Sequence, residues 1–269
     1  MTPVTATASV AAMTAEQRWA EQLAAWAIPD EILAQAPESP WIHPVRMFTV
    51  TGDEPDSPSR RRALEALPDG GSVLDVGSGG GRASLALVPP AGRLVAVDSR
   101  EEMLRAYADA ADARGVRHEE HLGRWPDVEA GVPVADVVVC HHVVYDVAPL
   151  TAFAQDGDAV VRARPVRTVE VPEALPVRRE TRERMARGQL EHDPSGRVPV
   201  ERLREAGLDA HADVWDDDWS ARRVLTAEEH ARFTRIRLCL PESREAEVAA
   251  ALADAPETPR RTATVWWDR

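Results

Sequence analysis

The chain has 269 residues, of which 44% are hydrophobic and 29% are charged, an ordinary balance for a globular protein. Its formal net charge is −13, and every basic side chain is an arginine because the sequence contains no lysine. Binding to nucleic acid or to an anionic membrane depends on basic patches, so this acidic chain is a poor candidate for either. We expect its partner to be a small molecule, uncharged or cationic.

The cysteines, the apolar runs and the N-terminal residues of the sequence limit which cellular compartment and which type of binding site we expect. Cys140 and Cys239 form neither a metal-ligand spacing nor a disulfide framework, so we expect no metal and a reducing compartment. No apolar run is long enough to span a membrane, and residues 1–15 lack the regions of a secretory signal. We therefore expect a cytoplasmic protein with a disordered tail over residues 1–15. The sequence does not indicate an oligomeric state.

The N-terminal part is predicted to be helical. Trp19, Leu23 and Trp26 recur at helical spacing within residues 16–26, and shorter helices are expected over 31–35 and 59–67. The proline-rich segment between them, residues 37–58, carries several aromatic side chains. It is either a packed connector or part of a cover over a substrate. We treat residues 16–67 as a cap that joins the rest of the chain as one structural unit.

Strands and helices then alternate to the end of the chain. This alternation predicts an α/β fold with a doubly wound, Rossmann-like, seven-stranded and mostly parallel sheet over residues 68–269. The strands are expected at 73–76, 94–97, 116–121, 135–140, 167–171, 210–215 and 261–267. Helices are expected at 82–87, 101–114, 147–161, 178–190, 200–206, from 227 onward and at 242–253.

A glycine-rich stretch follows the first of these strands. Four glycines lie within five positions, between an apolar run and a helix-compatible sequence, so the segment predicts a buried strand, a tight turn and a helix start. Glycine is needed where the backbone turns sharply and a ligand must touch it. The second strand ends in Asp98, where a carboxylate can accept hydrogen bonds from both hydroxyls of a ribose. Together these features predict a crevice that binds a nucleoside.

The glycine spacing indicates which nucleoside. The dinucleotide pattern Gly-x-Gly-x-x-Gly/Ala fails in both possible frames, because its third position falls on Arg82 or Ser84. The motif present is Asp-x-Gly-x-Gly-x-Gly, formed by Asp75, Gly77, Gly79 and Gly81. It resembles the first motif of the class I S-adenosylmethionine-dependent methyltransferases, and Asp98 matches that family's ribose-binding acid. The chain as a whole resembles uncharacterised actinobacterial members of this superfamily.

The resemblance implies roles for the first two motifs. S-adenosylmethionine is the expected cofactor, held by Asp75 near its methionine moiety and by the turn of Gly77, Ser78, Gly79 and Gly81. Alternatively, Asp75 only shapes the turn by accepting hydrogen bonds from the N–H groups of the loop. Ser99 and Glu102 fit a capping box, which would leave Asp98 free for the ribose. Met103 is expected to line the adenine pocket.

The third motif departs from the family pattern. Arg124 stands where the family usually has an acid that binds the adenine amino group. We expect backbone groups of Arg124 and Trp125 to bind the adenine edge, or Asp127 to replace the missing acid. Trp125 is placed to stack on the adenine, and the alternative is a loop tryptophan packed beside Pro126.

The fourth predicted strand ends in Cys140-His141-His142, and Tyr145 follows closely. Ligands of open α/β sheets lie at this carboxyl end. Two successive residues of a strand point in opposite directions, so the histidines are not expected to share a metal. The resemblance places His141 beside the transferring methyl group. His141, His142 and Tyr145 are the candidate catalytic residues, and the alternative is that both histidines only wall the pocket.

The sequence therefore predicts methyl transfer to an oxygen or nitrogen of a small-molecule acceptor by in-line displacement. Alignment of the reactants can supply most of the acceleration, so no metal and no covalent nucleophile are needed. One alternative is a non-catalytic protein that binds S-adenosylmethionine. A nicotinamide-dependent oxidoreductase is a second, which the glycine spacing disfavours.

Overall fold

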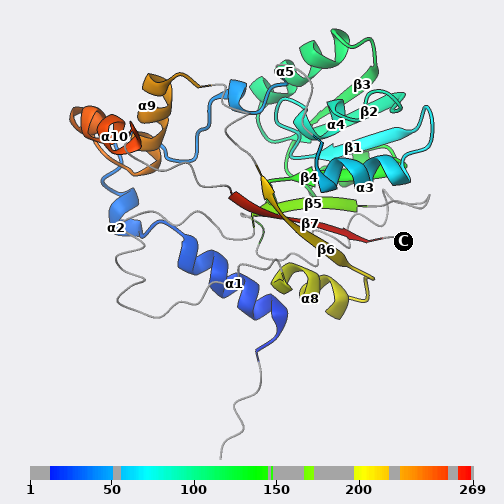
Figure 1. Cartoon of the computed structure of the whole chain (residues 1–269), viewed down its shortest axis with the longest axis horizontal. Helices are drawn as coiled ribbons and strands as arrows, with labels where there is room; N and C mark the ends of the chain where they lie inside the picture. Colours follow the sequence, from blue (N-terminus) through cyan, green and yellow to red (C-terminus); the bar gives the residue numbers. More distant parts are fainter. Residues whose placement is uncertain are drawn as a thin grey trace, which may run out of the picture.

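The computed structural model describes residues 13–50, 56–144, 147, 167–172, 197–217, 225–253 and 260–267. In these residues seven strands form one sheet in the order β3-β2-β1-β4-β5-β7-β6 (Figure 1). They are β1 Ser72–Val76, β2 Arg93–Asp98, β3 Arg117–Leu122, β4 Val137–His141, β5 Arg167–Pro172, β6 His211–Asp217 and β7 Arg260–Trp267. The expected α/β fold with a parallel sheet is confirmed.

The strand directions define where a ligand can bind. β1 pairs in parallel with both β2 and β4, whereas β7 pairs antiparallel with β5 and β6. The chain crosses from β1 to β2 on one side and later returns to place β4 on the other side. Doubly wound sheets bind ligands where the strand order reverses in this way, outside the carboxyl ends of the strands.

Helices cover both faces of the sheet because the apolar side chains of its central strands alternate. Val73, Leu94 and Val137 belong to a buried cluster with helices α3 (Pro58–Ala66), α4 (Arg82–Leu85) and α5 (Glu101–Asp112). Their neighbours along each strand, Leu74, Val95 and Val138, belong to a cluster with helices α1 (Ala15–Trp26) and α8 (Arg197–Glu205). Figure 1 shows these two groups of helices on opposite sides of the sheet.

Helix α1 is an integral part of the fold. It begins at Ala15, one residue earlier than expected, and Thr14 forms a capping box with Gln17. Trp19 is 3% exposed and its indole Nε1 donates to the carbonyl oxygen of Val147, 2.8 Å away. The first helix is thereby fixed beside the segment that follows β4.

A second group of helices lies away from the sheet. α9 (Ala227–Arg237) begins at the expected residue, after the N-cap Thr226, and packs against α10 (Glu245–Ala253). The short 3₁₀ helix Glu242–Arg244 precedes α10. Both figures show α9 and α10 at one end of the molecule, close to α2 (Asp30–Leu33). The chain from α2 toward the sheet includes the 3₁₀ helix η1 (Val45–Met47).

Two predicted helices, 147–161 and 178–190, fall outside the described residues apart from Val147. No helix of the described ranges is both long and apolar enough to cross a membrane. Cys140 and Cys239 are buried and not disulfide-bonded. The part of the chain that the structure describes holds no group of three or more His, Cys, Asp or Glu side chains that could bind a metal.

Candidate functional site

The turn after β1 explains the spacing of the glycine motif. Gly77, Gly79 and Gly81 have φ angles of 69°, 52° and 89°, in the left-handed region that glycine adopts most readily. Ser78 lies between the first two and is buried. The N–H groups of Gly77 and Ser78 both donate to the carbonyl oxygen of Val97 in β2, at 2.8 and 3.0 Å. The turn is therefore held tightly against the end of the neighbouring strand.

Two segments from elsewhere in the chain pack against this turn. A Cβ atom on Gly77 would lie 2.3 Å from Cγ2 of Val143, just beyond β4. A Cβ atom on Gly79 would lie 2.9 Å from Cβ of Phe48, in the N-terminal segment. No sequence motif singles out Val143, and the sequence of the segment around Phe48 fits both a packed connector and a cover.

We expect Gly77→Ala to lower the free energy of unfolding by about 2–4 kcal/mol, from a left-handed alanine plus an overpacked contact. Urea titration measures the loss. Gly115→Ala is the matched control, because Gly115 has a φ of 65° but nothing within 4 Å of the position that a Cβ atom would take. That control should lose only about 1–2 kcal/mol. Adding Val143→Ala should relieve part of the Gly77→Ala loss, and strictly additive effects would contradict this account of the turn.

Asp98 is more constrained than the sequence analysis expected. Its Oδ2 accepts from the N–H of Gly79 and its Oδ1 accepts from the N–H of Arg100, both at 2.9 Å. These two backbone hydrogen bonds are additional to the predicted ribose contact, which stays a prediction. A carboxylate has about four lone-pair positions, so two backbone donors leave acceptor capacity for the two hydroxyls of a ribose.

The same contacts explain why the predicted capping box is absent. The N-cap of α5 is Arg100, with no side-chain cap, and Ser99 is exposed. The carboxylate of Asp98 takes the N–H of Arg100, two residues further on, in the local hydrogen bond that aspartate favours. Met103 is 3% exposed on α5, so its side chain is buried.

Asp75 belongs to a buried polar network beneath the turn. It is 1% exposed, and its Oδ2 accepts from the hydroxyl of Ser84 at 2.6 Å and from the N–H of Ser84 at 3.3 Å. The hydroxyls of Ser84 and Tyr107 lie 2.9 Å apart. These donors come from α4, so the alternative in which Asp75 accepts hydrogen bonds from loop N–H groups is wrong.

Burial dominates the electrostatics of this network. Removal from water raises the pKa of the Asp75 carboxyl to about 7, against the lowering effect of the hydrogen bonds from Ser84. Burial, together with the charge of Asp75, raises the pKa of Tyr107 well above its usual value. Near neutral pH the network therefore holds a carboxyl group that is only partly ionised.

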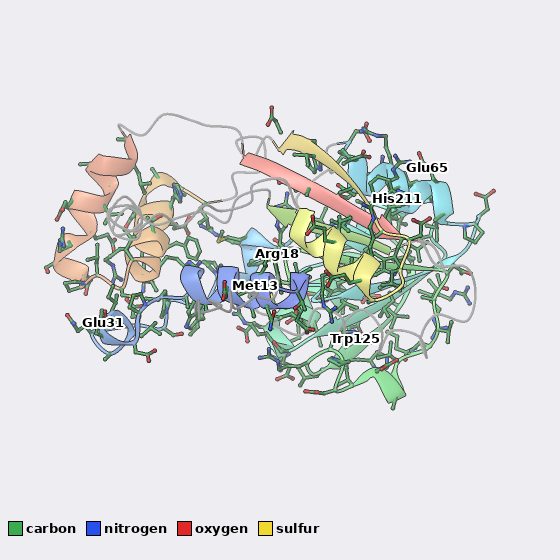
Figure 2. All side chains as sticks on the ribbon, turned by 90° about the horizontal axis from the view of Figure 1, so that it is seen from below. Met13, Arg18, Glu31, Glu65, Trp125 and His211 are labelled. Carbon is green, nitrogen blue, oxygen red and sulfur yellow. The ribbon has the colours of Figure 1, made fainter. Side chains whose placement is uncertain are left out.

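The loop after β3 adjoins the same end of the sheet, since the N–H of Gly123 donates to the carbonyl oxygen of Asp98 at 2.9 Å. The side chains of Arg124 and Asp127 are exposed. Trp125 is half-buried and packs against the core cluster that contains Trp19 of α1 (Figure 2). This packing against the core differs from the expected contact with Pro126, and stacking of Trp125 on adenine stays a prediction.

The histidines lie where β4 ends. Asp75 pairs with Val139, so two residues further along both strands come Gly77 and His141. His141 is the last residue of β4, and His142 has a φ of 59°. The expected strand alternation therefore stops at His142, because the backbone leaves the extended conformation there. Both histidines are half-buried, and Tyr145 lies outside the described residues.

Comparisons with known proteins agree with this fold. A protein-family model described as a methyltransferase domain matches residues 73–162. No curated protein matches the chain. The fold is similar to that of an S-adenosylmethionine-dependent methyltransferase from Geobacter sulfurreducens, solved with S-adenosyl-L-homocysteine, at 17% identity and a TM-score of 0.54, covering 91% of this chain and 100% of that one.

Two further solved structures give the same result. An S-adenosylmethionine-dependent methyltransferase from Thiobacillus denitrificans, also solved with S-adenosyl-L-homocysteine, has 17% identity and a TM-score of 0.54, covering 84% of this chain and 97% of that one. YjhP from E. coli has 15% identity and a TM-score of 0.51, covering 84% and 98%. At these identities the likeness shows the fold alone.

The fold and the glycine turn define a Rossmann-like α/β protein. The match over residues 73–162 is more specific: this third of the chain is similar to a methyltransferase domain.

Proposed function

We propose that this chain transfers a methyl group from S-adenosylmethionine to an oxygen or nitrogen atom of a small-molecule acceptor. The observation that carries the proposal is the position of Asp98, fixed by the N–H groups of Gly79 and Arg100 at the end of β2. The acceptor capacity left on this carboxylate suits a ribose diol. The left-handed turn beside it lets backbone approach the rest of the cofactor without an intervening side chain.

Each predicted site residue has a place in this proposal. When bound, the cofactor supplies a methyl group made electrophilic by its sulfonium. Asp98 would hold the ribose, and Gly77, Ser78, Gly79 and Gly81 would shape the wall against the methionine moiety above Asp75. Ser99, Met103, Arg124 and Trp125 would surround the adenine. His141 and His142, with Tyr145, would face the acceptor from the end of β4.

The acceptor is proposed from charge. The chain carries a formal net charge of −13, which disfavours polyanionic substrates. A small neutral or cationic acceptor fits better than RNA or DNA.

Calorimetry tests cofactor binding. S-adenosylhomocysteine should bind in the micromolar range, and NAD should not bind. Asp98→Ala should weaken binding by about 1.5–3 kcal/mol, the scale of a lost hydrogen bond to a charged group. Asp109→Ala removes an exposed carboxylate of α5 and should leave the affinity unchanged. Equal affinities in wild type and Asp98→Ala would refute the placement of the ribose.

Turnover separates an enzyme from a binding protein. Incubation with methyl-labelled S-adenosylmethionine and a pool of small metabolites should transfer label to an acceptor. Binding of the cofactor without any transfer across a broad pool would favour the non-catalytic alternative.

A further inference from the structure

Residues 38–49, here called the strap, connect α9 to the glycine turn. Three arginine contacts fix the strap to α9: Arg235 Nη2 lies 2.6 Å from Oε1 of Glu38, Arg237 Nη1 donates to the carbonyl oxygen of Pro40 at 3.0 Å, and Arg46 pairs with Glu229. Arg235 is 2% exposed, and it also bonds Glu245 and the carbonyl oxygen of Leu240. The outer end of the strap is thus held by a buried guanidinium, each of whose three nitrogens donates a hydrogen bond.

Aromatic packing joins the middle of the strap to the same helix. The ring centroid of His43 lies 5.2 Å from that of Phe233 on α9 and 5.8 Å from that of Phe48. The strap and α9 therefore form one packed body. Figure 1 shows this segment passing between α9 and the end of the sheet that carries α4 and α5.

The other side of the strap rests on the nucleoside site. Arg100 Nη1 donates to the carbonyl oxygen of His43 at 2.9 Å, and Arg82 Nη1 donates to that of Met47 at 3.3 Å. Thr49 forms an isolated antiparallel bridge with Gly81. Together with the contact of Phe48 on Gly79, these bonds place the strap directly over the turn.

Arg100 contacts both the nucleoside site and the strap. Its backbone N–H holds Oδ1 of Asp98, while its guanidinium holds the strap at His43. Gly79 plays the same double role, because its N–H donates to Oδ2 of Asp98 and Phe48 of the strap packs on it. The two groups that orient the ribose acid are therefore the same two that the strap touches.

Glu102 fixes the direction of the Arg100 side chain. Nε of Arg100 lies 3.1 Å from Oε1 of Glu102, and Nη2 pairs with the same oxygen. Nη1 is left to point at the strap carbonyl. The side chain is 29% exposed, so this junction is partly shielded from water.

We propose that Arg100 is a positioning residue that holds the strap closed over the nucleoside site and thereby sets the rate at which the cofactor leaves. The inference rests on the proposed function, because it assigns the nucleoside at Asp98 to S-adenosylmethionine. A closed strap would prevent release until the bond between Arg100 and His43 breaks. Arg100 itself needs no contact with the reacting atoms.

Two measurements on Arg100→Ala test the proposal, and the substitution leaves the backbone N–H to Asp98 in place. Stopped-flow displacement should show S-adenosylhomocysteine leaving about 10- to 100-fold faster than from wild type, the range for a lost charged hydrogen bond. Hydrogen–deuterium exchange of peptides spanning residues 41–49 should be faster in the cofactor-free protein. If Arg100 only stabilised the fold, Arg100→Ala would lower the melting temperature. The release rate of S-adenosylhomocysteine and the exchange rate of residues 41–49 would then show no change beyond that due to global unfolding.

Two further variants complete the test. Arg105→Ala removes an exposed arginine of the same helix, paired with Glu101, and should stay within about twofold of wild type, as expected for a surface ion pair. Arg100→Lys can still donate to the carbonyl of His43 and should recover part of the slow release.

The outcomes are distinct. Wild-type protein that binds S-adenosylhomocysteine, with unchanged release and unchanged exchange in Arg100→Ala, would overturn this inference alone. Wild-type protein that fails to bind S-adenosylhomocysteine would overturn the proposed function and this inference with it. Equal acceleration in Arg100→Ala and Arg105→Ala would assign the effect to net charge and also overturn the role of Arg100.

Discussion

Replacing Asp75 by asparagine should change how the stability of the protein depends on pH. The folded-state pKa of Asp75 is raised from 3.8 to about 7, chiefly by burial. Between these values the folded protein keeps a proton that the unfolded chain has released, so the free energy of unfolding falls as pH rises. Each unit of pKa difference corresponds to about 1.4 kcal/mol, and the whole interval to about 4 kcal/mol. Above pH 7 this contribution stays constant.

Urea unfolding at pH 5, 6, 7 and 8 measures the effect as a difference between variants. Asparagine keeps an acceptor for the hydroxyl of Ser84 and cannot ionise. As pH rises from 5 to 8, the free energy of unfolding of Asp75→Asn should therefore increase by about 3 kcal/mol relative to that of wild type. Asp109→Asn removes an exposed carboxyl group of α5 and should follow the wild-type profile. Parallel profiles for wild type and Asp75→Asn would mean that Asp75 ionises normally in the folded protein.

Much of the architecture could be predicted from the sequence because its strongest signals are local. β1, β2 and β4 are short runs of apolar residues buried on both faces, and such runs are typical of central parallel strands. The glycine turn follows from three residues that must have positive φ. These features need no knowledge of which distant segments meet.

The strap could not be predicted in detail because its contacts join residues far apart in the chain. His43 meets Arg100 across 57 positions, and Glu38 meets Arg235 across 197. The sequence showed only an aromatic, proline-rich segment, for which a packed connector and a cover were both reasonable. The structure shows the strap packed against α9 and against the turn, and a cover over a substrate stays a prediction.

Local competition explains the smaller errors. Ser99 and Glu102 have the residue types and spacing of a capping box, but the carboxylate of Asp98 takes the N–H of Arg100 and the side chain of Glu102 pairs with Arg100. For Asp75, bonding to the loop was one alternative, but the hydroxyl and the N–H of Ser84 on α4 donate to it instead. In both cases several groups could bond the same partner, and the sequence does not rank them.

Loss of a histidine at the end of β4 should have the largest effect on turnover. Transfer to an alcohol or phenol requires removal of a proton as the new bond forms, and histidine has an ordinary pKa near neutrality. His141 lies two residues beyond the pair of Asp75 and Val139, as Gly77 does, which places it beside the turn. We expect His141 or His142 to act as the base.

The substitutions must separate chemistry from backbone strain. His142 has a φ of 59°, so His142→Asn is preferable to alanine, because asparagine tolerates the left-handed conformation. His141→Gln keeps a polar side chain at the end of the strand. At least one of these variants should lose about 10²–10⁴-fold in kcat, the range for a lost general base. Both should retain the wild-type affinity for S-adenosylhomocysteine, which calorimetry checks.

The double variant decides between the two roles given to these histidines. If they only wall the pocket, His141→Gln with His142→Asn should keep near-wild-type kcat on the acceptor and alter KM alone. That result would exclude a histidine base. It would favour an acceptor that needs no deprotonation during transfer, such as a neutral amine. A loss of kcat that shrinks as pH rises toward the pKa of the acceptor hydroxyl would instead establish proton removal as the step that the histidine assists.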